Sequence, residues 1–156
     1  MRAKAFLSAI LFMATTFLPA CDRKAGNVQE AVAILTDAKK WRIDQILVND
    51  AVTFRDGKML TQFGGVQFES YMETVELRPD GTFSGVFKGA AGPFLLQWKA
   101  EQENISITDP KTTQKGGEWL ITPADVSPGG FTMTTRSTAY DYPNMTKIAL
   151  KFKPAS

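Results

Sequence analysis

The stretch YMETVELRPDGTFSGVF, residues 71–87, decides the fold. On both sides of Pro79-Asp80-Gly81, apolar residues alternate with polar ones, which is the pattern of two strands that each bury one face. Proline presets φ at the first corner of a turn, and Gly81 can take the left-handed conformation that a three-residue hairpin loop requires. The segment therefore predicts a β-hairpin of fixed register. On the apolar face, this register pairs Leu77 with Phe83, Val75 with Gly85 and Glu73 with Phe87.

The same period of two continues on both sides of this hairpin. Short β-rich segments separated by turn residues predict strands at 41–48, 68–78, 82–88, 94–100, 104–109, 117–122, 130–138 and 146–153. A second hairpin is expected across residues 101–104, with Trp98 opposite Ile107 and Ala100 opposite Ile105. No further helix of convincing length interrupts the strands, which argues against a parallel α/β sheet.

One helix is expected before the strands, over residues 27–39. Asn27 is a good N-cap, and Glu30 stands three residues later, as in a capping box. Its apolar residues lie at helical spacing, and its polar face is poor in lysine and arginine. We therefore expect this helix to pack on the core and not on a membrane.

The N-terminus has the layout of an export signal. Arg2 and Lys4 precede an uncharged apolar run, residues 5–20, which is shorter than a membrane-spanning helix requires. Cys21, the sole cysteine, follows Leu18-Pro19-Ala20, and polar residues begin directly after it. This arrangement resembles a bacterial lipoprotein signal peptide with its lipobox. The alternatives are an ordinary secretory signal with an incidental cysteine, or a short membrane anchor.

The lipoprotein resemblance implies a division of the chain and a location. Residues 1–20 would be removed, Cys21 would carry acyl chains such as palmitate, and residues 21–26 would form a tether to a domain at 27–156. The expected location is the bacterial cell envelope, lipid-anchored and facing the periplasm. Asp22 resembles an inner-membrane retention signal of enteric bacteria, a rule that fails in other lineages, so the choice of membrane stays open.

Composition excludes several classes of function. The chain has 18 basic and 16 acidic residues, and the signal contains two of the basic ones, so the remainder is balanced. A balanced chain lacks the basic excess that phosphate contacts require, which argues against a nucleic-acid partner. There is no histidine, and the one thiol is assigned to the anchor. Histidine-dependent triads, His or Cys metal sites and CxxC redox chemistry are therefore not expected, and neither is a cofactor.

Eight antiparallel strands with one apolar face each have edges to protect. Closure into an up-and-down barrel removes the edges, so the fold expected is an all-β, eight-stranded antiparallel barrel preceded by a helix. A two-sheet β-sandwich is the alternative. The motifs that carry a resemblance lie at 40–43 (KWRI), 77–83 (LRPDGTF), 96–98 (LQW), 105–107 (ISI) and 118–121 (EWLI). Together they resemble the bacterial lipocalin-like lipoproteins of the calycin type, over residues 30–153. The Gly-x-Trp that opens many eukaryotic lipocalins is absent, because Lys39-Lys40 precede Trp41.

The barrel interior is the candidate ligand site. The inward-facing residues that we expect to bind a small apolar ligand are Tyr71, Glu73, Phe87, Trp98, Trp119 and Met133. The alternative is that the same side chains form a packed core. Glu73 is the one carboxylate predicted on the inward face, and a rim position in water is its alternative.

Two loops are further candidates. The long connection at 49–67 resembles the lid of a lipocalin barrel, with Phe54, Met59 and Phe63 as its apolar residues and Gly64-Gly65 as its hinge. Its alternative is an extra hairpin around residues 55–58 that belongs to the barrel wall. The loop with Tyr140 and Tyr142 suits either recognition or an ordinary turn.

These observations favour a membrane-anchored protein that binds a small apolar ligand. The alternative is an envelope interaction module whose packed barrel binds a partner protein through its loops. An enzyme is not expected, because no closely spaced pair of inward carboxylates is found.

Overall fold

The computed structural model describes residues 23–61, 71–112 and 117–155. The first element of this described part is α1 (Val28–Asp37), and the other regular structure within it is extended apart from the 3-10 turn η1 (Pro123–Asp125). The strands are β1 (Trp41–Val48), β2 (Ala51–Arg55), β3 (Lys58–Met59), β4 (Met72–Leu77), β5 (Thr82–Phe87), β6 (Phe94–Ala100), β7 (Ile105–Thr108), β8 (Trp119–Ile121), β9 (Val126–Ser127), β10 (Gly130–Asp141) and β11 (Asn144–Pro154).

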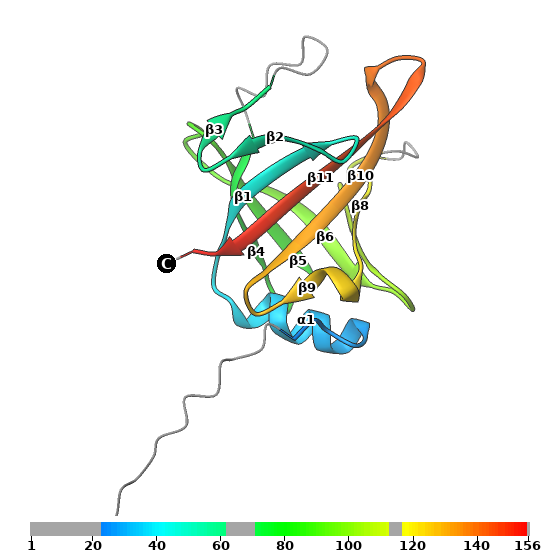
Figure 1. The fold of residues 1–156 in the computed structure, drawn as a ribbon. Coiled ribbons are helices and arrows are strands. Elements are labelled where there is room, and N and C mark those ends of the chain that lie inside the picture. The colour runs from blue at the N-terminus through cyan, green and yellow to red at the C-terminus, as the bar shows by residue number, and fades with distance from the viewer. Residues whose placement is uncertain (1–22, 62–70, 113–116, 156) are drawn as a thin grey trace, which may run out of the picture.

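Eight of these strands close into a barrel (Figure 1). Neighbours follow the order β11-β10-β8-β7-β6-β5-β4-β1, and β11 then pairs with β1, from Trp41 opposite Pro154 to Val48 opposite Ile148. Every pairing is antiparallel, and barrel strands that follow one another in the chain are neighbours in the sheet. This is the up-and-down topology of the lipocalins. The predicted barrel is confirmed, and the β-sandwich alternative is wrong.

The hairpin that suggested the fold forms largely as predicted. Leu77 pairs with Phe83 and Val75 with Gly85. Beyond them the register shifts between Met72 and Thr74, so that Met72 lies opposite Phe87. The predicted pairing of Glu73 with Phe87 is therefore wrong. This β-bulge puts the Glu73 side chain in solvent.

The turn of this hairpin has the expected chemistry. Gly81 has φ +88°, which favours glycine over residues that carry a Cβ. The Thr82 N–H donates to Asp80 Oδ1 at 2.9 Å, and this hydrogen bond lowers the pKa of Asp80. Arg78 donates to the carboxylate of Glu76 at 3.0 Å, which raises the pKa of Arg78. The second predicted hairpin also forms, with Trp98 opposite Ile107.

The helix α1 covers one end of the barrel, called the closed end below (Figure 1). Asn27 is its N-cap, and its Oδ1 accepts from the Glu30 N–H at 2.9 Å. Glu30 in turn accepts from the N–H of Gly26, one residue before the position expected in a capping box. The helix buries Val28, Ala31 and Leu35, as its apolar stripe predicts.

Trp41 joins α1 to the barrel. Its indole is completely buried, and its Nε1–H donates to the Leu35 carbonyl at 3.1 Å. The ring also meets Phe131 of β10 edge-on, with centroids 5.1 Å apart. A buried tryptophan needs such an acceptor for its N–H, so this hydrogen bond fixes where the helix ends relative to the first strand.

Strand β1 divides between two neighbours. Its first residues, Trp41 and Arg42, pair with β4, and residues 45–48 pair with β2. The β1–β2 turn places Asn49 and Asp50 at positive φ, and a turn at Asp56-Gly57 leads into β3. Residues 51–59 thus form an extra hairpin on the barrel wall, which confirms the alternative reading of this part of the connection.

Replacing Trp41 by phenylalanine should destabilise the fold by about 1–3 kcal/mol, because the Leu35 carbonyl loses its partner in a buried site. The matched control is Trp98→Phe. The Trp98 Nε1–H also donates to a carbonyl, that of Arg78 at 2.8 Å, but at an exposed turn where water can replace it. Urea unfolding measures both variants. Equal losses of unfolding free energy would contradict the role given to Trp41.

Candidate functional site

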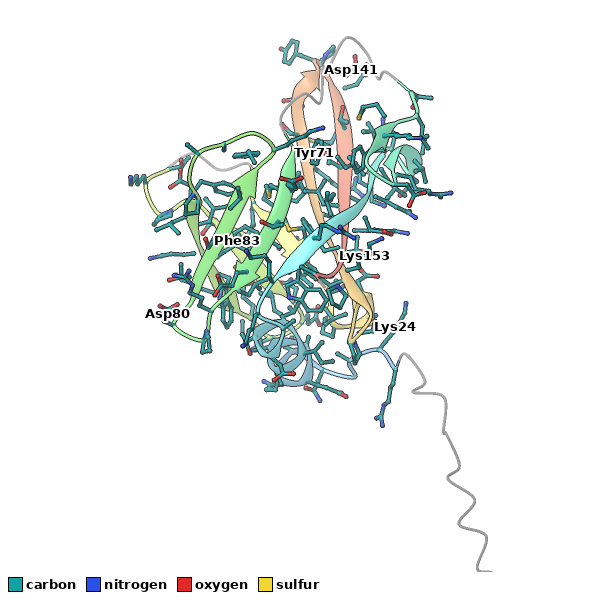
Figure 2. All side chains as sticks on the ribbon, turned by 90° about the vertical axis from the view of Figure 1, so that its left-hand side faces the viewer. Lys24, Tyr71, Asp80, Phe83, Asp141 and Lys153 are labelled. Atoms are coloured by element: carbon teal, nitrogen blue, oxygen red, sulfur yellow. The ribbon has the colours of Figure 1, made fainter. Side chains whose placement is uncertain are left out.

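The end of the barrel opposite α1, called the mouth below, is the candidate site. The turn at Asp80 and residue Lys24 lie toward the closed end, and Asp141 marks the far tip (Figure 2). Tyr71 lies nearer the tip than Phe83 does (Figure 2). Strands β1, β5, β7 and β10 end at the mouth, and strands β4, β6, β8 and β11 begin there.

The two ends of the interior differ in how completely they are filled. Side chains nearer α1 are almost completely buried, and they include Trp41, Leu77, Phe83, Ile105, Ile121 and Phe131. Nearer the mouth, four aromatic residues are only half-buried, namely Tyr71, Phe87, Phe94 and Trp119, while Val48 and Ile148 are buried. Partly exposed rings are therefore concentrated in the mouth half, although Trp98 near the closed end is also half-buried.

Four rings, called the mouth aromatics below, line this half: Phe54, Tyr71, Phe87 and Phe94. Phe54 and Tyr71 are in contact with centroids 4.7 Å apart, and Phe87 stacks on Phe94 at 4.5 Å. The ammonium of Lys88 lies 5.5 Å from the Tyr71 ring centroid, within the range of a cation–π contact. Flat, apolar faces with one cation beside them suit an aromatic or polyene ligand.

Gly85 makes room for one of these rings. An added Cβ at this position would overlap the Phe94 ring, so the absence of a side chain on β5 allows Phe94 to lie over the strand. Phe94 therefore occupies the space over Gly85 in the mouth half.

Hydroxyl groups lie on the opposite wall, formed by β10 and β11. Thr135 donates to the Glu118 carbonyl at 2.7 Å and is buried. Thr146 is buried on the same inward face, and its Oγ1 has no hydrogen-bond partner among the described residues. A buried hydroxyl without a partner is uncommon, and a polar group of a bound molecule would satisfy it after a rotation of the side chain.

The predicted site residues do not all lie together. Tyr71 and Phe87 belong to the mouth aromatics, and Trp119 begins β8 at the same end. Met133 is completely buried in the core, and Trp98 lies beside the β4–β5 turn toward the closed end. Glu73, predicted to point inward, is exposed because of the bulge at Met72.

The residues predicted for the lid fall into two groups. Phe54 is buried in the wall, where it pairs with Ile46, and Met59 is exposed at the end of β3. Phe63, Gly64 and Gly65 lie outside the described residues, so the hinge stays a prediction.

A hollow of about 380 Å³ opens through the side of the wall, where β1 leaves β4 to pair with β2. Its apolar lining comes from Ile43, Phe54 and Tyr71. Its charged residues are Arg42, Lys153, Asp56 and Glu73. Glu73 thus lies at the same side opening as two of the mouth aromatics, Phe54 and Tyr71. A second, shallower hollow of about 500 Å³ lies along β10, β11 and β1, where Lys153 pairs with Asp44 at 2.6 Å.

Apolar side chains also protrude at the rim of the mouth. Tyr142 is 85% exposed and Met145 57% exposed at the β10–β11 tip, and Leu60 is 55% exposed after β3. The side chain of Tyr140 is not among those described. These rim residues offer a contact surface for another molecule.

The described residues contain no group of three or more side chains of the kinds that hold a metal ion. Within the same residues, no helix has the length and apolar character needed to cross a bilayer.

Phe94, Gly85 and Thr146 are the positions that sequence reasoning missed. Phe94 follows the loop signal Gly92-Pro93 and stands on the apolar face of its strand, so alternation alone would have found it. The complementarity of Gly85 with Phe94 depends on the β5–β6 register, which no short turn fixes.

Comparison with known proteins gives little to add to this geometry. No protein-family model matches the chain, and no curated protein does. Among solved structures, the chain is similar to the bovine lipocalin allergen Bos d 2, with 15% sequence identity and a TM-score of 0.43. The match covers 80% of this chain and 75% of the other. Because this likeness is distant, the assignment of the barrel fold rests on the strand pairing described above.

Proposed function

We propose that this chain is a lipocalin-like lipoprotein, anchored to a membrane through Cys21, that binds one small apolar molecule in the mouth half of its barrel. The observation that carries the binding role is the contrast in burial along the interior. Apolar rings that a packed core would cover completely remain partly exposed at Tyr71, Phe87 and Phe94. Their exposure costs free energy that a bound apolar molecule would recover.

The same contrast limits the size of the ligand. An eight-stranded barrel has room for its own side chains or for one small ligand, and here the half beneath α1 is already filled. The ligand would therefore occupy the mouth half alone, with its flat face on Phe87 and Phe94. A single polar group on it would lie toward Thr146 on the opposite wall.

The anchor is supported by the sequence, since Cys21 is the only cysteine and stands at the end of the apolar run. The location that follows is the bacterial cell envelope, with the barrel facing the periplasm.

One observation favours a second function, that of an envelope protein-interaction module. Tyr142 and Met145 protrude at a loop tip, as the anchors of a protein interface do. In that case the partner would contact the rim, and the interior would remain without a ligand.

An apolar fluorescent probe such as N-phenyl-1-naphthylamine should bind the wild-type protein in a saturable way. Phe87→Ala should weaken this binding roughly 5- to 30-fold, because the lost ring contact is worth about 1–2 kcal/mol. Phe94→Ala is expected to increase the number or size of the probes accepted, since it empties the space over Gly85. Titration of probe fluorescence measures both effects.

Leu95→Ala is the matched control, because Leu95 is adjacent to Phe94 but 59% exposed and thus outside the interior. It should leave binding of the probe unchanged. An interior that excludes the probe in wild type and in Phe94→Ala would reject the ligand-binding role and favour the interaction module.

Cys21→Ser should abolish incorporation of an alkynyl fatty acid and move the protein from the membrane to the soluble fraction, since two or more acyl chains are needed for firm anchoring. Asp22→Asn, which retains the thiol, is the control and should stay labelled. Acyl labelling that survives in Cys21→Ser would show that the anchor is elsewhere or absent.

A further inference from the structure

The chain enters the barrel at its closed end. The backbone N–H of Ala25 donates to the Val126 carbonyl of β9 at 2.8 Å, and the Ala25 side chain is buried. Strand β9 pairs with the first residues of β10, next to α1. Gly26 is bound in the same place through the Glu30 carboxylate. The described chain is therefore fixed to the barrel from Ala25 onward.

Only Asp22, Arg23 and Lys24 separate Cys21 from this fixed point. The connection from Cys21 to Ala25, called the leash below, is four residue steps long and spans at most about 14 Å when fully extended. Strands β10 and β11, with 12 and 11 residues, run from the closed end to the mouth. At 3.3 Å per residue and a tilt near 40°, they separate the two ends by roughly 28 Å. The leash is thus about half as long as the barrel.

On this basis we propose that the closed end is the membrane-facing end of the protein. This inference rests on the lipidation of Cys21 proposed above. The outer stripe of α1, formed by Gln29, Ala33 and Asp37, faces the bilayer surface while the apolar stripe stays packed on the core, and the mouth opens away from the membrane. A short leash at the closed end does not let the opposite end reach the same membrane.

Charge at the closed end is mixed. Arg23 and Lys24 precede α1, and Lys39 and Lys40 follow it, all with exposed side chains. These basic residues suit a surface that contains anionic lipid headgroups, but Asp37 on the outer stripe and Asp80 in the β4–β5 turn do not, so the orientation rests on the length of the leash and not on charge. Exposed apolar residues at the rim, such as Tyr142 and Met145, would instead favour an inverted barrel, but the leash is too short to bring them to the bilayer.

The orientation has a consequence for the ligand. With the mouth turned away from its own membrane, the mouth aromatics exchange ligand with the aqueous compartment, or with a protein that contacts the rim. Direct extraction of a lipid from the anchoring bilayer is disfavoured.

The test places a fluorophore on single introduced cysteines in the full-length acylated protein, in which the Cys21 thiol is blocked. The positions are Ala33→Cys on α1, Met145→Cys at the mouth and Lys151→Cys on the exposed side of β11. The protein is reconstituted in vesicles of phosphatidylethanolamine and phosphatidylglycerol that contain headgroup-nitroxide lipids. Quenching at Ala33 should be several-fold stronger than at Met145, with Lys151 between them. Strongest quenching at Met145 or at Lys151 would overturn the proposal.

A lengthened leash provides the control. Insertion of about 20 Gly/Ser residues between Arg23 and Lys24 gives a mean reach of roughly 25 Å and should largely remove the difference between Ala33 and Met145. A difference that persists unchanged would show that leash length does not set the orientation. Flotation and acyl labelling report the anchor separately. A wild-type chain that does not float refutes the lipidation, whereas one that floats with another quenching pattern refutes only the orientation.

Discussion

The buried indole of Trp41 is the interaction on which the rest of the structure depends. Trp41 stands where β1 meets β4 on one side and β11 on the other, at the seam that closes the barrel. Its ring packs on Phe131, and its N–H binds the last turn of α1 through Leu35. One residue thus aligns the sheet closure, the capping helix and the closed-end core. Because the interior there is dense, the helix has one position, and any free space is left to the mouth.

Alternation and turn chemistry predicted most of the fold. Where a short turn fixes the register, as at Pro79-Asp80-Gly81, the predicted pairs are those of the structure. The prediction fails at Glu73, because a bulge adds one residue and reverses which side chains point inward beyond it. Bulges depend on how the whole sheet bends, and no local pattern announced this one. The two alternatives for the first connection, a lid or a wall hairpin, likewise differ in a strand pairing that the local pattern does not contain. In the structure β2 pairs with β1.

The candidate site was predicted less completely than the fold. Alternation tells which side chains face the interior but not how far along the barrel axis they lie, since the strands are tilted and staggered. Trp98 and Phe87 both face inward, yet Trp98 lies by the β4–β5 turn near α1 and Phe87 lies at the mouth. The fit of the Phe94 ring over Gly85 is likewise a relation between two strands. The sequence predicts most of the aromatic residues that face the interior. Only the structure separates the rings that fill the core from those that remain accessible.

The barrel therefore assigns different tasks to its two ends for a physical reason. An apolar interior of this width cannot be both well packed and open throughout, and α1 together with Trp41 fills the end where the chain is tied down. The closed end is completely packed, whereas the mouth contains partly exposed rings and the unpartnered hydroxyl of Thr146. Under the anchoring proposed above, the tether joins the densely packed end, which leaves the mouth free to meet a ligand or a partner. The same separation is the reason to expect that a single substitution at the mouth alters binding of the proposed ligand and leaves the closed-end core unchanged.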